Sequence, residues 1–163
     1  FFFKKLKKNR KFICINETVG EGTRDVKFLE AGPTGGIIGD NYDNNFKKRE
    51  TLLKKLKKKI KIKKTKNLQK ILEENNAPFI IDYFSLDVEG AETEIIKNFD
   101  FSKYIFLAMT VERPTPEINK ILFKNDYIFI KNYKVDSFYV HKSIKNIQMI
   151  KKDKFSQLPP KSW

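Results

Sequence analysis

The stretch IIDYFSLDVEGAE, residues 80–92, decides the fold of this chain. From Phe79 to Leu86 the residues are mostly large and apolar, and tyrosine, phenylalanine and isoleucine favour an extended backbone. A run of this kind is too short for a helix and predicts a central parallel strand that is covered on both faces. Gly90 then permits a tight turn, and the apolar spacing from Ala91 to Phe99 predicts a helix.

Two carboxylates, Asp87 and Glu89, follow where this strand should end. In open α/β sheets, ligands bind outside the carboxyl ends of the strands. Asp87 and Glu89 are therefore candidate functional residues. The alternative is that Asp87 only caps the helix that follows.

The rest of the chain alternates strands and helices in the manner of an α/β protein. The run YIFLAMTVE, residues 104–112, predicts a second buried strand. The segment from Thr115 to Glu117 predicts a helix start, because it combines a capping hydroxyl, a proline and an acid. The pattern also predicts a helix over residues 1–9, strands over 11–16 and 25–30, a loop over 31–45, a short helix and a strand in the basic run 47–66, a helix after Asn67, and an antiparallel hairpin over 127–133 and 136–141.

The second apolar strand also ends in a carboxylate, Glu112. Neighbouring parallel strands present their carboxyl ends at one edge of a sheet, so we expect Glu112 to lie beside Asp87 and Glu89. Such a cluster could bind a cation, act as a general base or hold substrate hydroxyls. The alternative is that Glu112 only pairs with Arg113 or a lysine. The glycines between residues 32 and 39 lie in the predicted loop, without the strand-turn-helix context of a phosphate-binding site.

Composition limits the possible classes of protein. The 163 residues suffice for one domain with a core, and no apolar run is long enough to span a bilayer. One cysteine and one histidine exclude an internal disulfide, a cysteine metal cluster and a multi-histidine site; we expect a cytoplasmic location. The net charge of +14 suits nucleic acid, an anionic membrane surface or an acidic substrate, or it reflects only a solvated basic surface. The basic run 47–66 lacks interleaved aromatic residues on which bases could stack.

The segment IDYFSLDVEGAE, residues 81–92, resembles the signature of the FkbM-type methyltransferases, which are S-adenosylmethionine-dependent enzymes of the class I Rossmann-like fold. The resemblance covers roughly residues 2–142. The other segments that carry it are NETVG at 16–20, VKF at 26–28, the helix after Asn67, TVE at 110–112 and VDSFYVH at 135–141.

The resemblance implies that the chain transfers a methyl group from S-adenosylmethionine to a hydroxyl oxygen of a sugar, a lipid or a small metabolite. Asn16 and Glu17 would then lie on the cofactor side. Asp87, Glu89 and Glu112 would lie on the substrate side, where Asp87 would accept the hydroxyl proton or orient the nucleophile. Glu89 is expected to hold the turn or to pair with the helix start.

His141 is a further candidate as a proton acceptor at the rim of the site, although a single histidine at a strand end is more often structural. No metal ligands are assigned. Two other functions compete with methyl transfer. One is a non-catalytic basic module that binds RNA or an acidic glycan, and the other is an inactive methyltransferase-like scaffold.

The chain also departs from the family pattern, because the glycine-rich turn after the first strand and the acid after the second are missing. We therefore expect a Rossmann-like α/β sheet that lacks its first two strands and ends in a closing antiparallel hairpin. Residues 1–142 would form a partial methyltransferase domain, with a loop and basic insertion at 31–66. Residues 143–163 would form a basic C-terminal extension, and this piece alone is expected to be inactive.

Overall fold

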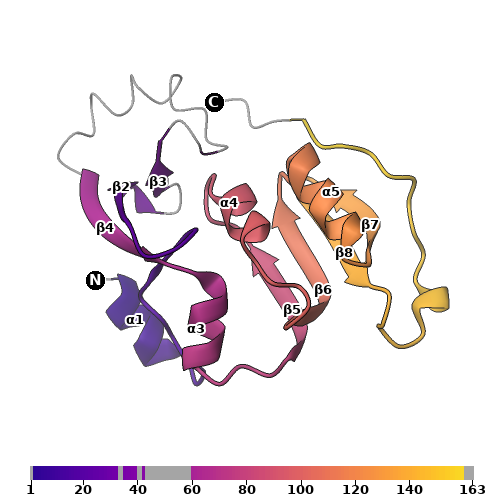
Figure 1. Ribbon diagram of the computed structural model, residues 1–163, viewed down its shortest axis with the longest axis horizontal. Coiled ribbons are helices and arrows are strands. Elements are labelled where there is room, and N and C mark those ends of the chain that lie inside the picture. The colour runs from indigo at the N-terminus through magenta and orange to yellow at the C-terminus, as the bar shows by residue number, and fades with distance from the viewer. Residues whose placement is uncertain (1, 33–34, 40–41, 43–59, 160–163) are drawn as a thin grey trace.

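The computed structural model describes residues 2–32, 35–39, 42 and 60–159. Two mixed four-stranded sheets lie side by side, with helices packed against them (Figure 1). The helices are α1 (Phe2–Asn9), α3 (Leu68–Glu74), α4 (Glu92–Lys97), α5 (Pro116–Lys124) and the short 3-10 helix η3 (Ile147–Met149). The strands are β1 (Thr18–Val19), β2 (Asp25–Leu29), β3 (Gly36–Ile38), β4 (Ile60–Lys66), β5 (Ile80–Leu86), β6 (Ile105–Glu112), β7 (Tyr127–Tyr133) and β8 (Asp136–His141).

The first sheet has the strand order β1-β4-β2-β3. The short β1 runs parallel to β4, with Thr18 opposite Thr65, whereas β2 is antiparallel to both β3 and β4. Thr65 is buried, and its hydroxyl donates to the carbonyl of Arg24 at 3.1 Å. Val26 and Ile37 form a small apolar cluster with Ala91, so the first sheet packs directly against the start of α4.

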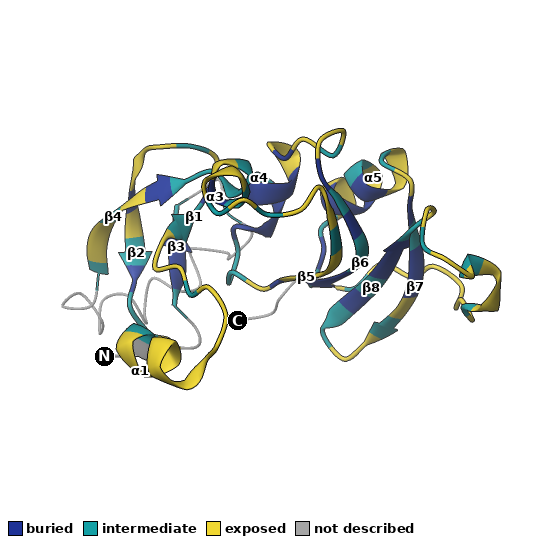
Figure 2. Ribbon diagram, turned by 90° about the horizontal axis from the view of Figure 1, so that it is seen from below, coloured by how far each residue is buried: buried dark blue, intermediate teal, exposed yellow. Residues whose placement is uncertain are grey.

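The second sheet has the order β5-β6-β8-β7 and contains the main core. Strands β5 and β6 are parallel, as predicted, and their last paired residues are Leu86 and Val111. The hairpin of β7 and β8 completes the sheet in antiparallel fashion. Helices α4 and α5 cover one face, where Ile96 and Ile118 are fully buried. Figure 2 shows that buried residues gather on β6, β8 and the inner sides of these helices, whereas α1 is mostly exposed.

Several local predictions are confirmed by hydrogen bonds or by backbone angles. Asn67 caps α3, and its side-chain oxygen accepts from the backbone N–H of Gln69 at 2.8 Å. Thr115 caps α5, whose first residue is Pro116. Lys134 makes the hairpin turn with a φ of 54°.

The predicted strand over residues 11–16 is wrong. The backbone there has no strand partner in the described residues, and pairing begins only at Thr18. Phe12 and Ile13 are 66% and 67% exposed, so the alternation of the sequence has no buried face to fill. Alternating apolar residues stabilise a strand only when a neighbouring strand and a core are present.

The prediction that β5 is a central strand covered on both faces is also wrong. β5 lies at the edge of its sheet and pairs only with β6 within the described part of the chain. Ile80 and Tyr83 are 58% and 54% exposed. The apolar composition of the run indicates a central strand. The same composition also suits an edge strand that further structure covers.

The glycine-rich segment was predicted as loop, yet Gly36–Ile38 forms β3 and pairs with Leu29–Lys27 of β2. The strand predicted at the end of the basic run is confirmed as β4, whereas the short helix predicted before it falls on residues 47–59, outside the described residues.

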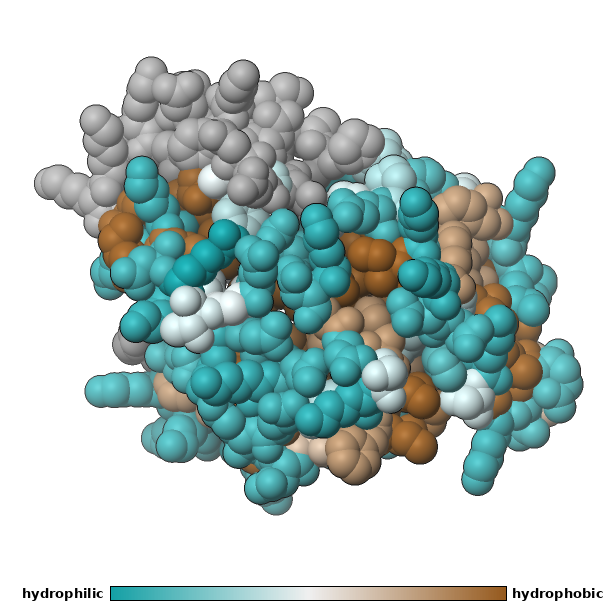
Figure 3. Space-filling view, in the orientation of Figure 1, coloured by the Kyte–Doolittle hydropathy of each residue, from teal (hydrophilic) through white to brown (hydrophobic). Residues whose placement is uncertain are grey.

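No helix in the described ranges has both the length and the apolar content needed to cross a bilayer. The face of the molecule in Figure 3 is mainly hydrophilic, with apolar side chains showing in separate patches.

The segment after η3, residues 150–158, packs along β7 and α5 as an extended strap, which is the yellow trace at the right of Figure 1. The backbone N–H of Asp153 donates to the carbonyl of Ile130 at 2.7 Å. The ring of Phe155 packs edge-on against Phe123 and Phe129, with centroids 5.3 and 5.2 Å away. The predicted basic extension is therefore docked on the second sheet through its residues 153–157.

Candidate functional site

Three carboxylates meet at the edge where β5 and β6 end. One carboxylate oxygen from each of Asp87, Glu89 and Glu112 lies within 4.8 Å of the others. The parallel register explains this arrangement, because Leu86 pairs with Val111 and the next residues, Asp87 and Glu112, therefore lie at the same edge of the sheet. The convergence of these carboxylates agrees with the expectation from the sequence.

Asp87 is the most exposed of the three carboxylates. It does not cap the following helix, because the N-cap position of α4 is Ala91. Its carboxylate makes no hydrogen bond or ion pair with the described residues, so it is available to a ligand.

The turn after β5 is held by a residue that the sequence did not single out. Glu92 is only 4% exposed, and its two oxygens accept from the backbone N–H groups of Val88 and Gly90, each at 2.9 Å. Glu89 and Gly90 have φ values of 58° and 113°, in the left-handed region. Glu92 thus makes two of the bonds that hold the turn, and Glu89 contributes a carboxylate oxygen to the cluster. That Glu89 also holds the turn or pairs with the helix start stays a prediction.

The first sheet reaches this turn through a glycine. A Cβ atom on Gly36 would lie 2.8 Å from the carbonyl oxygen of Glu89 and 3.1 Å from its Cβ. Only glycine allows β3 to come this close to the turn. The glycine-rich segment, which had no assigned purpose in the sequence, therefore joins the two sheets at the site.

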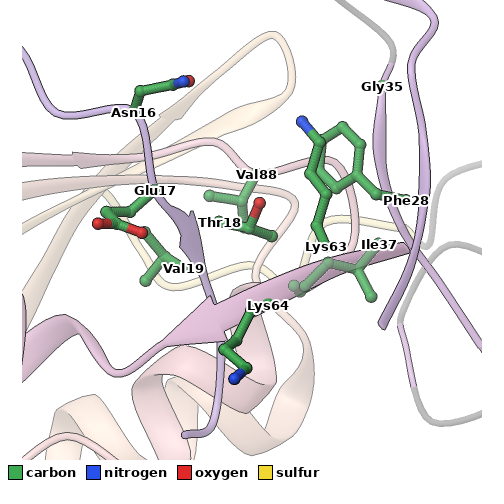
Figure 4. Close-up of a pocket in the computed structure, with 11 residues that line it drawn as sticks. Asn16, Glu17, Thr18, Val19, Phe28, Gly35, Ile37, Lys63, Lys64 and Val88 are labelled. Carbon is green, nitrogen blue, oxygen red and sulfur yellow. The ribbon is translucent and has the colours of Figure 1, made fainter. Parts of the chain in front are cut away.

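A pocket of about 490 Å³ lies between the first sheet and the turn (Figure 4). Its polar wall comes from the segment around β1, with Asn16 and Glu17, the two residues expected on the cofactor side. Its apolar wall includes Ile37 of β3 and Val88 of the turn. Glu17 also lies 3.6 Å from the ammonium group of Lys66.

Protein-family comparison supplies the observation that decides the identity of the chain. Residues 4–129 match the model of the Methyltransferase FkbM domain. The chain belongs to the FkbM methyltransferase family. Searches of curated proteins and of solved structures found no match.

Membership in the FkbM family implies S-adenosylmethionine-dependent methyl transfer. The matched residues include both walls of the pocket and all three carboxylates. They end inside β7, so β8 and the strap lie beyond the matched part of the FkbM domain.

His141 does not join the FkbM site. In the antiparallel pair of β6 and β8, Asp136 stands opposite Glu112, and His141 lies at the other end of β8. His141 is five residue steps along the strand from Asp136, which is about 16 Å. There His141 contacts Ser143 through Nδ1 at 2.7 Å and packs against Tyr127. Its predicted role as a proton acceptor at this site is therefore not supported.

Sequence reasoning missed Lys63 and Phe28, which line the same pocket from β4 and β2. The ammonium group of Lys63 lies 4.2 Å from the centroid of the Phe28 ring (Figure 4). It also lies 3.5 Å from a carboxylate oxygen of Glu30. Lys63 is one of many lysines in the basic run, so the sequence does not distinguish it. The pairing of β2 with β4 places it over the ring of Phe28.

Proposed function

We propose that the chain methylates a hydroxyl oxygen of a sugar, a lipid or a small metabolite, with the three carboxylates at the β5–β6 edge on the acceptor side. The convergence of Asp87, Glu89 and Glu112 within 4.8 Å is the observation that carries this proposal. Carboxylates are suited to hydroxyl acceptors, because they accept hydrogen bonds and can take up the proton that the hydroxyl loses.

The residues around the pocket fit the cofactor that the family implies. S-adenosylmethionine, when bound, supplies an activated methyl group on a sulfonium. Glu17 and Asn16 offer oxygen acceptors for the hydroxyl and ammonium groups of such a ligand, and Ile37 and Val88 offer apolar contact. Because Val88 follows Asp87 directly, a ligand in this pocket borders the segment that carries the carboxylates.

In the proposed reaction S-adenosylmethionine would supply the methyl group to the acceptor oxygen, with S-adenosylhomocysteine as the leaving product. The hydroxyl proton passes to the carboxylate of Asp87, and Glu89 and Glu112 hold the acceptor by hydrogen bonds. Such a displacement depends mainly on the position of the reacting atoms. The buried Glu92 contributes indirectly, because it fixes the turn between Asp87 and α4.

The exposed edge of β5 supports a finer proposal about the fold. The order β5-β6-β8-β7 corresponds to one half of a class I methyltransferase sheet, and we propose that two further strands extend this sheet beyond β5, the first of them paired with β5. Exposed apolar residues on β5, such as Ile80 and Tyr83, would then be covered. Binding of S-adenosylmethionine by this chain alone should be weak, since the added strands would contribute the remaining contacts.

Calorimetric titration with S-adenosylmethionine tests this proposal. We expect a polypeptide extended at its amino end by those strands to bind the cofactor. Glu17→Gln should weaken that binding about tenfold, the equivalent of one charge-assisted hydrogen bond. Glu21→Gln is the matched control, because Glu21 is an exposed carboxylate of the next turn that pairs with Arg24 and does not line the pocket.

Release of S-adenosylhomocysteine in the presence of methyl hexosides, phosphoglycerol or hydroxy acids would then identify the class of acceptor. Cofactor binding by the extended polypeptide that is equal for wild type and Glu17→Gln would contradict the assignment of the pocket. Absence of acceptor-dependent product with every hydroxyl compound would contradict methyl transfer to oxygen.

A further inference from the structure

We propose that Gln157 is a positioning residue for the carboxylates at the β5–β6 edge, and that it acts through the loop that follows Glu112. The inference rests on the proposed role of Glu112 on the acceptor side. Gln157 lies in the strap, 28 residues beyond the end of the match to the FkbM domain at residue 129.

The side chain of Gln157 bridges the loop and helix α5. Its Nε2 donates to the carbonyl of Pro114 at 2.6 Å, and its Oε1 accepts from Nδ2 of Asn119 at 2.7 Å. Asn119 is buried and accepts in turn from the hydroxyl of Tyr139, which is 1% exposed. These bonds form a continuous polar chain from the sheet to the loop.

The strap holds Gln157 in place along β7. The N–H of Asp153 donates to the carbonyl of Ile130, which lies at the irregularity in the pairing of β7 with β8. Nδ2 of Asn132 donates to the carbonyl of Ser156 at 2.9 Å and lies 3.0 Å from its hydroxyl oxygen. The strap directly before Gln157 is therefore fixed independently of the Gln157 side chain.

The loop needs such support because its backbone is unusual. Arg113 has a φ of 43°, a left-handed value that a residue with a side chain adopts only when its surroundings enforce it. Its N–H donates to the carbonyl of Val135 at 2.8 Å, and Thr115 contacts Thr93 through their hydroxyl oxygens at 2.9 Å. Pro114 between them is fully buried, and its carbonyl meets Gln157.

Glu112 is the residue directly before this loop, and its carboxylate belongs to the cluster. Without the Gln157 amide, the carbonyl of Pro114 would lose this part-buried hydrogen bond, which favours a change of backbone conformation. A change at Arg113 and Pro114 would move the end of β6 and with it the carboxylate of Glu112. The strap, which lies outside the residues that match the family, would thereby support the site.

The test compares Gln157→Glu with Ser156→Ala in the purified protein. Gln157→Glu keeps an acceptor for Asn119 and removes the donor to Pro114, whereas Ser156→Ala removes a neighbouring hydroxyl and leaves Gln157 unchanged. Gln157→Met is the second variant, since it fills a similar volume without adding a charge. The readouts are the carboxyl ¹³C resonance of Glu112 and the hydrogen exchange of the Arg113 amide.

We expect both Gln157 variants to shift the Glu112 resonance and to speed exchange of the Arg113 amide about tenfold, the equivalent of one hydrogen bond. Ser156→Ala should change neither. Unchanged Glu112 and Arg113 signals in folded Gln157→Met, or equal changes in Ser156→Ala, would overturn the inference.

The same variants distinguish this inference from the proposed function. In the active polypeptide, Gln157→Met should lower kcat about tenfold and leave the Kd for S-adenosylmethionine unchanged. If no methyl transfer is found with wild type, the proposed function fails, whereas the two spectroscopic readouts still decide the role of Gln157. Altered spectra with wild-type kcat would overturn the positioning role.

Discussion

The segment from Asp87 to Glu92 contains three carboxylates with different surroundings. Asp87 is exposed, Glu89 is half-buried, and Glu92 is buried with both oxygens bonded to the backbone. In the sequence they differ only in position. The structure separates a residue that is available to an acceptor from one that holds the turn.

Glu92→Gln should destabilise the protein by about 2 kcal/mol, because one oxygen that accepts a backbone N–H is replaced by a donor. Urea unfolding measures this change. Glu94→Gln on the same helix is the control, and it should change stability by less than about 0.5 kcal/mol. Burial, and secondarily the neighbouring Glu21, already raise the pKa of Glu94, so loss of its charge removes little. Equal effects of the two variants would refute the role of Glu92.

Gly36→Ala should destabilise the contact between β3 and the turn by about 1–3 kcal/mol, because the added methyl group would lie 2.8 Å from the carbonyl oxygen of Glu89. Gly22→Ala is the matched control, since a Cβ there meets nothing within 4 Å. Thermal unfolding of both variants checks the expectation. A Gly36→Ala protein as stable as Gly22→Ala would show that β3 does not approach the turn closely.

At the scale of elements, the sequence predicts best where a local pattern and its capping residues agree. Helices α3 and α5 were found from Asn67 and from the Thr115-Pro116 pair, and the parallel pair of β5 and β6 followed from two apolar runs that end in carboxylates. The strand expected over residues 11–16 failed, because alternation reports what a strand requires and not whether a partner is present.

The site could be predicted in part for the same physical reason. The cluster of Asp87, Glu89 and Glu112 follows from parallel register, which the order of elements determines. The contacts of Lys63 and Gln157 depend on pairing between residues distant in the chain, and no local pattern contains that information.

The buried end of the β7–β8 hairpin gives a pH-dependent prediction. Burial raises the pKa of Tyr127 to about 12, and a hydrogen bond from the Phe106 N–H opposes this effect only in part. The neutral form is therefore favoured in the folded state. The contribution of Tyr127 is fully present below about pH 10, the ordinary pKa of tyrosine, and is lost as the pH rises towards 12.

We expect this group to reduce the unfolding free energy by about 1 kcal/mol between pH 8 and pH 11. Tyr127→Phe should remove that part of the alkaline loss, whereas Tyr133→Phe, at an exposed position on the same strand, should not. Urea unfolding of wild type and both variants at the two pH values provides the comparison. An identical alkaline loss in wild type and Tyr127→Phe would argue against burial of the hydroxyl.

At the scale of the whole molecule, the two sheets meet where the methyltransferase signature lies. The first sheet supplies the pocket with Asn16 and Glu17, the second supplies the carboxylates, and Gly36 brings them together. The acidic cluster belongs to a protein that is strongly basic as a whole, with a net charge of +14. That contrast suits an acceptor whose hydroxyl is held by carboxylates while its remaining surface is neutral or anionic.

The most direct test of this account is the rate of methyl transfer by the polypeptide extended at its amino end, compared between its Asp87→Asn and Asp82→Asn variants, with thermal unfolding measured on both. Asp82 is an exposed aspartate on the same strand, β5, outside the cluster. We predict that Asp87→Asn lowers kcat at least about 100-fold, as expected for loss of a proton acceptor, with an unchanged melting temperature, while Asp82→Asn retains wild-type turnover. Wild-type turnover by a stably folded Asp87→Asn protein would contradict the central claim.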